Sequence, residues 1–353
     1  MNTMKFKCTL LTDVVLNQRS ATEGSRQTLD FIPGNNFLGI VASELYGKGI
    51  DGKKALTLFH TGDVKFGDAH PSKGGVRGLK IPAMMFYPKL KQMTEECYIH
   101  YLVPDLSCED IKKKQLKQCR SGFYCFSPSE KKAEKVRVER GFAIKSAYDK
   151  QNRRSKDEMM YGYESLEKGS EFYFEICFNA QSEQYKEEVK NCLVKGNKRI
   201  GRSRTAQYGL VKIEEFEYEQ VNPDFRKEGN MVAVYADGRL IFLDEFGMPT
   251  FRPTAADLGL DKGIIRWDKS QIRTFQYAPW NYKRQAYDAD RCGIEKGSVF
   301  IVELPEGDSL SPVKYVGSYQ NEGFGKVMYN PAFFRANAEG KAIYQFTEPV
   351  SDG

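Results

Sequence analysis

The alternation of apolar and polar positions predicts a mixed α+β chain in which strands outnumber helices. Residues 4–16 (MKFKCTLLTDVVL) alternate closely enough to predict a strand, and the polar stretch 17–30 is predicted to be a loop. Residues 31–47 (FIPGNNFLGIVASELYG) begin with a Pro-Gly turn and continue with apolar residues at helical spacing, which predicts a helix ending at Gly47. The chain is therefore expected to open as strand, loop and helix.

The middle of the chain continues this pattern with further strands and one helix. Residues 136–149 and 171–178 have strand patterns, and the long polar stretch between them predicts a protruding β-hairpin. A shorter apolar run at 96–103 is also predicted to be a strand, followed later by a helix at 184–195 and a strand at 207–219. Helices do not alternate regularly with strands, so this order favours a ferredoxin-like (RRM-like) domain over a doubly wound sheet.

A polar stretch with Pro and Gly at 221–230 predicts a linker, and the sequence beyond it is rich in strand patterns and poor in helical ones. We therefore expect an N-terminal ferredoxin-like domain over 1–220, which includes a basic insertion and the hairpin. A smaller, β-rich domain related to the first is expected over 231–340.

Composition adds a strong local charge to this picture. The chain of 353 residues has a net charge of +6, but residues 111–156 carry fifteen Lys or Arg against four Asp or Glu. Aromatic residues accompany this charge (Phe123, Tyr124, Phe126, Phe142 and Tyr148), a combination that suits a polyanion with stackable bases. A solvated lysine-rich helix at 111–118 would explain part of the excess. The sequence contains no apolar run of membrane-spanning length and no signal-peptide pattern at its start, so we expect a cytoplasmic protein without a membrane partner.

Eight cysteines occur without a C-x-x-C pair and are expected to be reduced. A candidate zinc cluster comprises Cys97, His100, Cys108, Cys119 and Cys125, but its spacings match no zinc pattern, and buried thiols are the preferred interpretation. We expect no metal and no cofactor.

The glycine-rich stretch 196–209 (GNKRIGRSRTAQYG) resembles a nucleotide-hydrolase phosphate loop, with Arg202 in place of the lysine. Such a loop leaves a strand and enters a helix, whereas this one is predicted to leave a helix and enter a strand, which argues against nucleotide hydrolysis. Its glycines and basic side chains could instead bind the phosphates of a nucleic acid, although an ordinary polar connection would look similar.

Three segments in order resemble the RAMP superfamily of CRISPR effector subunits. LDFIPGNNFLGIVASELY resembles the family's I-P-G turn and helix, GNKRIGRSRTAQYGLVKIEEF resembles its basic glycine loop before a strand, and NEGFGKVMYNPAFF resembles its terminal G-F-G loop. The chain is most similar to the type III-D subunit of the group that caps the 5′ tag of the guide RNA. The resemblance spans most of residues 1–335 and implies two ferredoxin-like domains, glycine-rich loops and a protruding hairpin, or thumb.

The resemblance also implies a function and its residues. It implies an RNA-binding subunit that holds guide RNA, meets target RNA through the guide, and packs against the large signalling subunit and the backbone subunits. The implied RNA contacts are Gly34, Asn35 and Asn36 in the turn, Arg153 and Arg154 in the hairpin, Lys198, Arg199, Gly201, Arg202 and Arg204 in the second segment, and Gly323, Phe324, Gly325 and Lys326 in the third.

Two departures from the family pattern bear on catalysis. The loop 17–30 lacks the upstream Asp of subunits that cut target RNA, and the three histidines have no evident partner, so we assign no catalytic residue. One alternative is a metal-independent endoribonuclease that processes CRISPR precursor RNA, with His60 or His70 assisting attack by a 2′-hydroxyl. Another is a subunit that chiefly holds proteins together.

Overall fold

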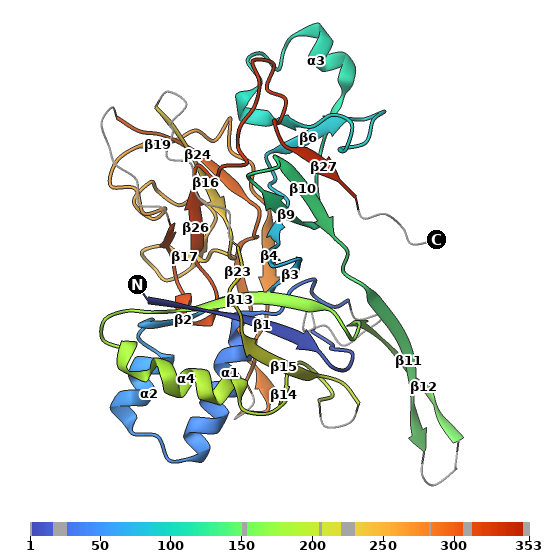
Figure 1. The fold of residues 1–353 in the computed structure, drawn as a ribbon, viewed down its shortest axis with the longest axis vertical. Coiled ribbons are helices and arrows are strands. Elements are labelled where there is room, and N and C mark those ends of the chain that lie inside the picture. Colours follow the sequence, from blue (N-terminus) through green and yellow to red (C-terminus); the bar gives the residue numbers. More distant parts are fainter. Residues whose placement is uncertain are drawn as a thin grey trace.

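The computed structural model describes residues 2–16, 27–149, 154–204, 207–219, 230–281, 284–305 and 313–348, without the side chains of 145–149, 154–161 and 313–314. In these residues the chain has a mixed α+β fold with many strands and few helices, as the sequence predicted (Figure 1). Among the described helices, none is long and apolar enough to cross a membrane.

A seven-stranded sheet is built from strands within residues 2–77 and 171–215, which are called the first half of the chain below. Four of its strands lie side by side in the order β15-β1-β13-β2, and every neighbouring pair is antiparallel. Helices connect β1 to β2 and β13 to β15, while β14 extends one edge of the sheet and β3 and β4 extend the other. The strands are β1 (Asn2–Leu10), β2 (Val64–Phe66), β3 (His70–Lys73), β4 (Val76–Arg77), β13 (Glu171–Phe178), β14 (Lys198–Arg199) and β15 (Leu210–Glu215).

Both faces of this sheet are buried at β13, whereas β1 and β15 bury one face and leave the other partly exposed. Alternate residues of β13 point to opposite faces, and Phe174 on one face stacks on Phe37 at 3.7 Å and on Phe6 at 5.2 Å between ring centroids. On the other face, Glu175 and Cys177 contact the second half of the chain, which comprises the described residues between 230 and 348. Figure 1 shows the consequence, with α1, α2 and α4 on one side of the sheet and the second half on the other.

The helices agree with the predicted periodicity where it was strongest. The helix predicted within 31–47 is confirmed as α1 (Gly34–Gly47), and the helix predicted at 184–195 as α4 (Lys186–Val194). A second helix, α2 (Gly52–Phe59), was not predicted; Asp51 caps it by accepting hydrogen bonds from two backbone N–H groups. The lysine-rich helix exists only in part, as α3 (Glu109–Lys114).

The predicted strand at 96–103 is largely wrong. Only β7 (Tyr98–Ile99) is extended, and the chain then turns into a short 3-10 helix, η1 (His100–Leu102). The N–H of His100 donates to the carbonyl of Met84 and that of Val103 to the carbonyl of His100, so the segment bends instead of running straight. An apolar run of this length is compatible with either conformation, which is why its period did not decide the matter.

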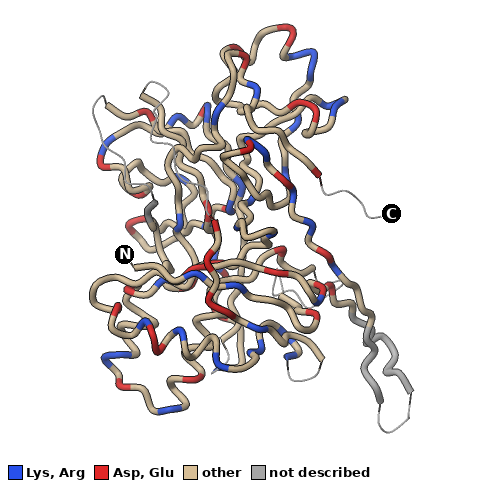
Figure 2. The backbone as a smooth tube through the Cα atoms, in the orientation of Figure 1, with Lys and Arg blue, Asp and Glu red and all other residues tan. Residues whose placement is uncertain are grey.

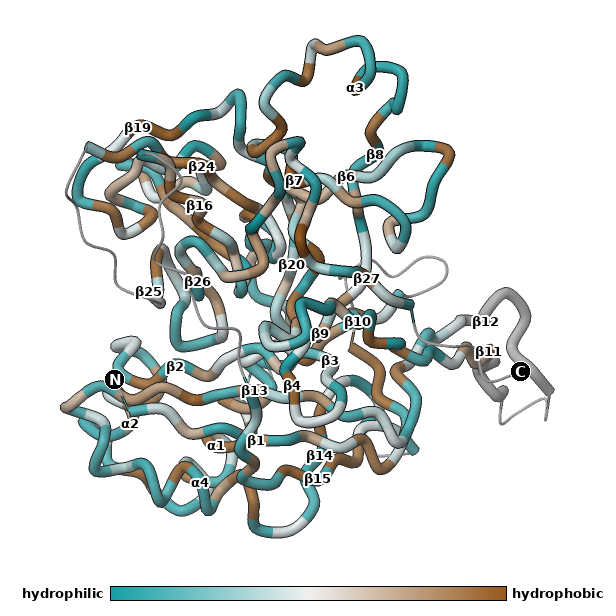
Figure 3. The backbone as a smooth tube through the Cα atoms, turned by 45° about the horizontal axis from the view of Figure 1, so that its top comes forward, coloured by the Kyte–Doolittle hydropathy of each residue, from teal (hydrophilic) through white to brown (hydrophobic). Residues whose placement is uncertain are grey.

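A five-stranded sheet forms the second half, and no α-helix occurs in the described residues between 230 and 348. Its order is β19-β24-β16-β26-β25, and the strands are β16 (Met231–Ala236), β19 (Ile264–Ile265), β24 (Val299–Glu303), β25 (Val313–Tyr315) and β26 (Lys326–Tyr329). Figure 3 shows hydrophobic positions concentrated along β16 and β24. Short hairpins flank the sheet: β17 (Phe242–Leu243) with β18 (Pro249–Thr250), β20 (Thr274–Tyr277) with β23 (Arg291–Ile294), and β21 (Trp280–Asn281) with β22 (Ala286–Tyr287). The 3-10 helices η2 (Glu183–Tyr185) and η3 (Gln320–Glu322) complete the helical elements described.

The segment between β4 and β11 packs with the second half of the chain. One core cluster combines residues from the 79–133 region, including Phe126, with residues of the second half such as Phe333, and these two rings stack at 4.3 Å. The region supplies β5 (Leu79–Lys80), β9 (Phe123–Ser127) and β10 (Lys132–Val136), which form a sheet with the C-terminal β27 (Gln345–Thr347). It also supplies β6 (Met85–Pro88) and β8 (Leu116–Gln118), which pair with each other, while β7 pairs with β6. The division at 220 and 231 stays a prediction, and these contacts cross it.

The protruding hairpin is built from β11 (Arg140–Asp149) and β12 (Arg154–Leu166), and Figure 1 shows it projecting away from both halves. The predicted strand at 136–149 is therefore one arm of the hairpin itself, whereas the hairpin was expected to begin after it.

Candidate nucleic-acid interface

The turn at the start of α1 is fixed by close backbone contacts. Gly34 is buried, and a Cβ atom there would clash with the carbonyl oxygen of Phe66, so a glycine is required. The N–H of Gly34 donates to Oδ1 of Asp68 at 2.8 Å. This carboxylate lies at the N-terminus of α1, where the helix dipole stabilises negative charge.

Asn35 and Asn36 follow in the first turn of the helix and are half-buried. The side-chain amide of Asn35 donates to the hydroxyl of Tyr277 at 2.8 Å, and that of Asn36 donates to the carbonyl of Pro33 at 3.1 Å. Asn35 therefore links the start of α1 to a hairpin in the second half of the chain.

The glycine-rich loop runs from helix α4 to strand β15, in the order that the sequence predicted. Gly201 has a φ of +75°, and a Cβ atom there would lie 2.5 Å from the carbonyl oxygen of Val15. The N–H of Arg202 donates to the same oxygen at 2.9 Å, and Nη1 of Arg199 donates to the carbonyl of Arg204 at 2.6 Å. These contacts order the loop backbone, while the side chains of Arg199 and Arg202 are exposed.

A groove of about 710 Å³ lies between the turn and the glycine-rich loop. Among the described residues that line it, Glu44 is the only carboxylate, and it pairs with Lys198 at 3.4 Å. The groove therefore has a surplus of positive charge. Seven predicted RNA contacts line it: Asn35, Asn36, Lys198, Arg199, Gly201, Arg202 and Arg204.

A wall of the groove comes from the described residues of the hairpin region 277–287, which sequence analysis did not assign to the site; they are Tyr277, Ala278, Trp280, Gln285 and Tyr287. Tyr277 is buried, Trp280 is 50% exposed, and the ring of Tyr287 meets that of Trp280 edge to face at 5.0 Å. The stretch YAPWNYKRQAY mixes aromatic and basic residues, a composition typical of nucleic-acid surfaces, and this signal could have identified it.

The second predicted glycine loop, 323–326, lies in the interior beneath the turn. A Cβ atom on Gly323 would lie 3.2 Å from the Cα atom of Gly34, so the first and third motifs pack directly on each other. Gly325 has a φ of +92° and an added Cβ would clash with a carbonyl oxygen. Phe324 and Lys326 are 1% and 6% exposed. These residues support the turn and do not face the groove.

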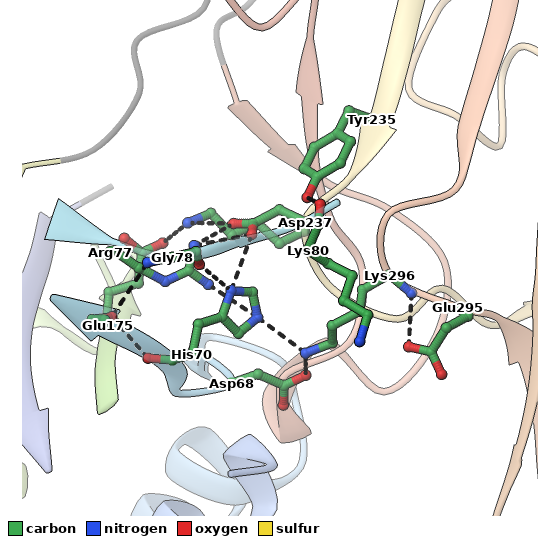
Figure 4. A network of polar contacts seen from close by, with 12 residues as sticks. Asp68, His70, Arg77, Gly78, Lys80, Glu175, Tyr235, Asp237, Glu295 and Lys296 are labelled. Carbon is green, nitrogen blue, oxygen red and sulfur yellow. Dashed lines mark hydrogen bonds and ion pairs between the residues drawn. The ribbon is translucent and has the colours of Figure 1, made fainter. Parts of the chain in front are cut away.

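Buried charges join the two halves next to this loop (Figure 4). Nζ of Lys296 donates to Asp68 at 2.9 Å, and Nη1 of Arg77 donates to both carboxylate oxygens of Asp237 at 2.9 and 3.0 Å. Nζ of Lys326 lies 3.1 Å from Asp237. Each cation thus has an anionic partner, as buried charges require.

The cluster fixes the protonation states of its members. Burial alone would raise the pKa of Asp237, but Arg77 and Lys326 hold it far below its usual value, so the group is a carboxylate. Burial, reinforced by the charges of Arg77 and Lys296, lowers the pKa of His70 well below 6.5, so this ring is neutral.

The histidines do not form a catalytic arrangement with the groove. His70 is fully buried, with Nδ1 2.8 Å from the carbonyl of Gly78, and cannot meet a 2′-hydroxyl in this conformation. His60 is exposed at the end of α2, and it does not line the groove. Within the described ranges, no three His, Cys, Asp or Glu residues are grouped so that they could hold a metal ion. Cys97, Cys119 and Cys125 are buried thiols, as preferred from the sequence, whereas Cys108 is exposed.

The part of the basic segment whose side chains the structure describes, residues 111–144, is more neutral in space than in sequence. Six of its cations pair with carboxylates, some of them from distant parts of the chain, and Figure 2 shows both signs of charge mixed in each half. The paired residues are Lys113, Lys114, Lys132, Lys135, Arg137 and Arg140.

The proposed stacking role of Phe123, Tyr124 and Phe126 is wrong. These side chains are 0%, 3% and 1% exposed and form the core of the sheet they belong to. Phe142, on the hairpin, is 60% exposed. Arg153 lies outside the described residues, as does the side chain of Arg154, and the side chain of Tyr148 is likewise not described.

Fold and groove define a strand-rich α+β protein with a basic cleft beside an aromatic hairpin. The chain is similar to chains in two cryo-EM structures of type III-B Cmr-beta bound to cognate target RNA, one of them also with AMPPnP. In each case the identity is 12%, the match covers 84% of this chain and 86% of the other, and the TM-score is 0.48. Oligomeric Cmr4 from Pyrococcus furiosus matches at 12% identity over 60% of this chain and 97% of its own, with a TM-score of 0.29. No family model and no curated protein matches the chain. At such distances the function has to be argued from the chain's own residues.

Proposed function

We propose that this chain is a non-catalytic RNA-binding subunit of a type III CRISPR effector complex and that its groove holds guide RNA. The observation that carries this proposal is the meeting of the turn at 33–36 with the glycine-rich loop at 197–204 in one groove. These motifs resemble RAMP motifs and lie far apart in the sequence. An ordinary polar connection at 197–204 would have no reason to line the same groove as the turn.

The chemistry of the groove suits an RNA backbone. Arg199 and Arg202 are exposed residues beside it, and guanidinium groups bind phosphate oxygens with two parallel hydrogen bonds. Asn35 and Asn36 line the same groove, and their side-chain oxygens are acceptors suited to 2′-hydroxyl groups. Such contacts recognise RNA without reading much of its sequence.

The finer assignment follows the motif resemblance. The β15-β1-β13-β2 order, with helices between β1 and β2 and between β13 and β15, supports a ferredoxin-like domain in the first half. The second half is proposed to be a β-rich relative. We assign the chain to the type III-D subunit of the group that caps the 5′ tag of the guide, with target RNA reached through the guide. The large signalling subunit and the backbone subunits are the proposed neighbours.

Replacing Arg202 and Arg204 together by Ala tests the groove. We expect weaker binding of single-stranded RNA and a shallower salt dependence, because fewer counterions are released; the slope of log K against log salt should fall by about 0.7 per lost phosphate contact, about 1.4 for two. Fluorescence anisotropy titrations at several salt concentrations measure both quantities. The matched control is Lys112→Ala with Lys113→Ala on α3, which removes two exposed charges away from the groove. A salt slope that is the same for wild type and the arginine variant would remove this loop from the binding site.

The competing endoribonuclease assignment is tested in the same preparation. His60 is the exposed candidate for a general acid or base, so cleavage of repeat-containing RNA that disappears in His60→Ala would replace our proposal. Purification of the chain with its genomic neighbours, followed by sequencing of the bound RNA and mapping of its crosslinks, tests the scaffold alternative, because a scaffold would lack RNA crosslinks to the groove.

A further inference from the structure

The hairpin region 277–287 gives the groove an aromatic wall near its basic loop. The hairpin is joined to α1 through the hydrogen bond from Asn35 to the hydroxyl of Tyr277, which is buried. Trp280 then extends into the lining of the groove with half of its surface exposed. A large aromatic side chain exposed at a concave basic surface is costly to leave in water, and it marks a contact site.

We infer that Trp280 is the stacking platform for an unpaired base of the RNA whose phosphates contact the loop 198–204, an inference that rests on the function proposed above. The ring of Tyr287 stands at 79° to the indole with centroids 5.0 Å apart. This edge-to-face contact supports the indole without stacking parallel to it, so Tyr287 and a base can contact the same residue. Trp280 belongs to no RNA-binding motif named from the sequence, and its role would be to select single-stranded over paired RNA.

The occupant is a nucleotide because the groove combines two features at once. The exposed residues Arg199 and Arg202 provide cationic side chains for phosphate, while Trp280 provides a ring of the right size for a base. Glu44, the single carboxylate among the described lining residues, pairs with Lys198, so the described lining carries more cations than anions. The groove, with a volume of about 710 Å³, is large enough for a small ligand whose polar groups and ring both contact its walls.

Stacking of this kind tolerates any base, because every base has a π face. The platform therefore explains how the groove could distinguish an unpaired nucleotide without reading its identity. A duplex would keep its bases stacked inside the helix and could offer only phosphates.

The chain permits a direct spectroscopic test because it has two tryptophans, Trp267 and Trp280. Trp267→Phe leaves Trp280 as the only indole, and its fluorescence should fall on titration with a short single-stranded RNA of mixed sequence. Trp280→Phe leaves Trp267, which is 45% exposed and lines no part of the groove, and its emission should not change. A matching RNA duplex should leave the emission of Trp280 unchanged.

Affinity provides a second readout. Trp280→Ala should weaken single-stranded RNA binding about 5- to 150-fold, the range that base stacking on an aromatic residue contributes, whereas Trp280→Phe should retain most of the affinity. The thermal unfolding midpoints of both variants are compared with wild type to show that each is folded.

The outcomes separate this inference from the proposal it rests on. If Arg202→Ala with Arg204→Ala weakens binding but Trp280 emission does not respond and Trp280→Ala binds normally, the groove holds RNA and the platform is wrong. If the arginine variant binds RNA as the wild type does, both fail. If Trp280 emission responds to a purified neighbouring subunit and not to RNA, the aromatic wall is a protein contact and the inference is overturned.

Discussion

Asp237 should be one of the residues on which the stability of this chain depends most. Its carboxylate is 1% exposed and receives hydrogen bonds from Arg77 on both oxygens, with Lys326 3.1 Å from one of them. Asp237→Asn keeps the shape of the side chain but removes its charge. It also replaces one carboxylate oxygen, which accepts hydrogen bonds, by an NH2 group, which donates them. On that side, an N–H donor of Arg77 or Lys326 then faces another donor.

The cost can be estimated from the burial of the partners. Removing one member of a buried ion pair typically destabilises a protein by about 3–5 kcal/mol, because the remaining charge is buried without compensation. Two cations lose their partner here, although Lys326 retains Glu175 at 2.7 Å. We therefore expect the free energy of unfolding to fall by about 3–5 kcal/mol at neutral pH.

The pH dependence follows from the depressed pKa of Asp237. Although burial favours the neutral acid, Arg77 and Lys326 keep the folded-state pKa far below the unfolded value, which is about 3.9. The unfolded chain therefore binds the proton first as the pH falls, so the stabilisation is complete above the unfolded pKa and decreases below it. The difference between wild type and Asp237→Asn should be constant near neutrality and should narrow below about pH 4.

Urea denaturation followed by circular dichroism, repeated across this pH range, measures both effects. Asp268→Asn is the matched control, since Asp268 pairs with Arg266 at 3.1 Å on the surface and its loss should change stability little. A destabilisation by Asp237→Asn no larger than that of the control would refute the reasoning.

Three glycines allow further predictions. Gly201→Ala should destabilise the chain and weaken RNA binding, because it combines a left-handed φ with a Cβ contact of 2.5 Å to Val15. Gly196 has a similar φ of +72° but open space around it. The difference between Gly201→Ala and Gly196→Ala in the free energy of unfolding, measured by urea denaturation, therefore gives the cost of the steric clash alone, and equal losses would contradict the clash. Gly39→Ala, inside α1 with no atom within 4 Å of the added Cβ, should stabilise the chain by about 0.5–1 kcal/mol, and a lower unfolding midpoint would count against helix propensity as the governing factor.

Local patterns predicted local structure well in this chain. The helical spacing after Gly34 corresponds to α1 because the pattern is long enough to decide the conformation, and the run at 171–178, rich in Phe, Tyr and Ile, corresponds to β13. The short run at 96–103 was ambiguous, and η1 was decided by backbone hydrogen bonds to Met84, which no local pattern records.

The sequence predicted the motifs of the site but not how they come together in space. Loop 196–204 and the turn at Gly34 could be recognised, but their approach depends on the sheet that places Val15 beside Arg202. The pairing of Asp68 with Lys296 is not visible in the sequence because it joins two halves far apart along the chain. The same distance explains why Lys326, a basic residue in a glycine loop, was predicted to contact RNA although its partners are buried carboxylates.

Asp68 receives the amide of Gly34 with one oxygen and the ammonium of Lys296 with the other. The turn that lines the groove is thus tied to the second half of the chain through this carboxylate as well as through the hydrogen bond from Asn35 to Tyr277. Separating the halves would part Asp68 from Lys296 and Glu175 from Lys326. Such an opening is costly, so the two halves should unfold as one cooperative unit. The proposed binding of RNA would then be thermodynamically linked to folding, and changes deep in the second half would alter binding without touching a groove residue.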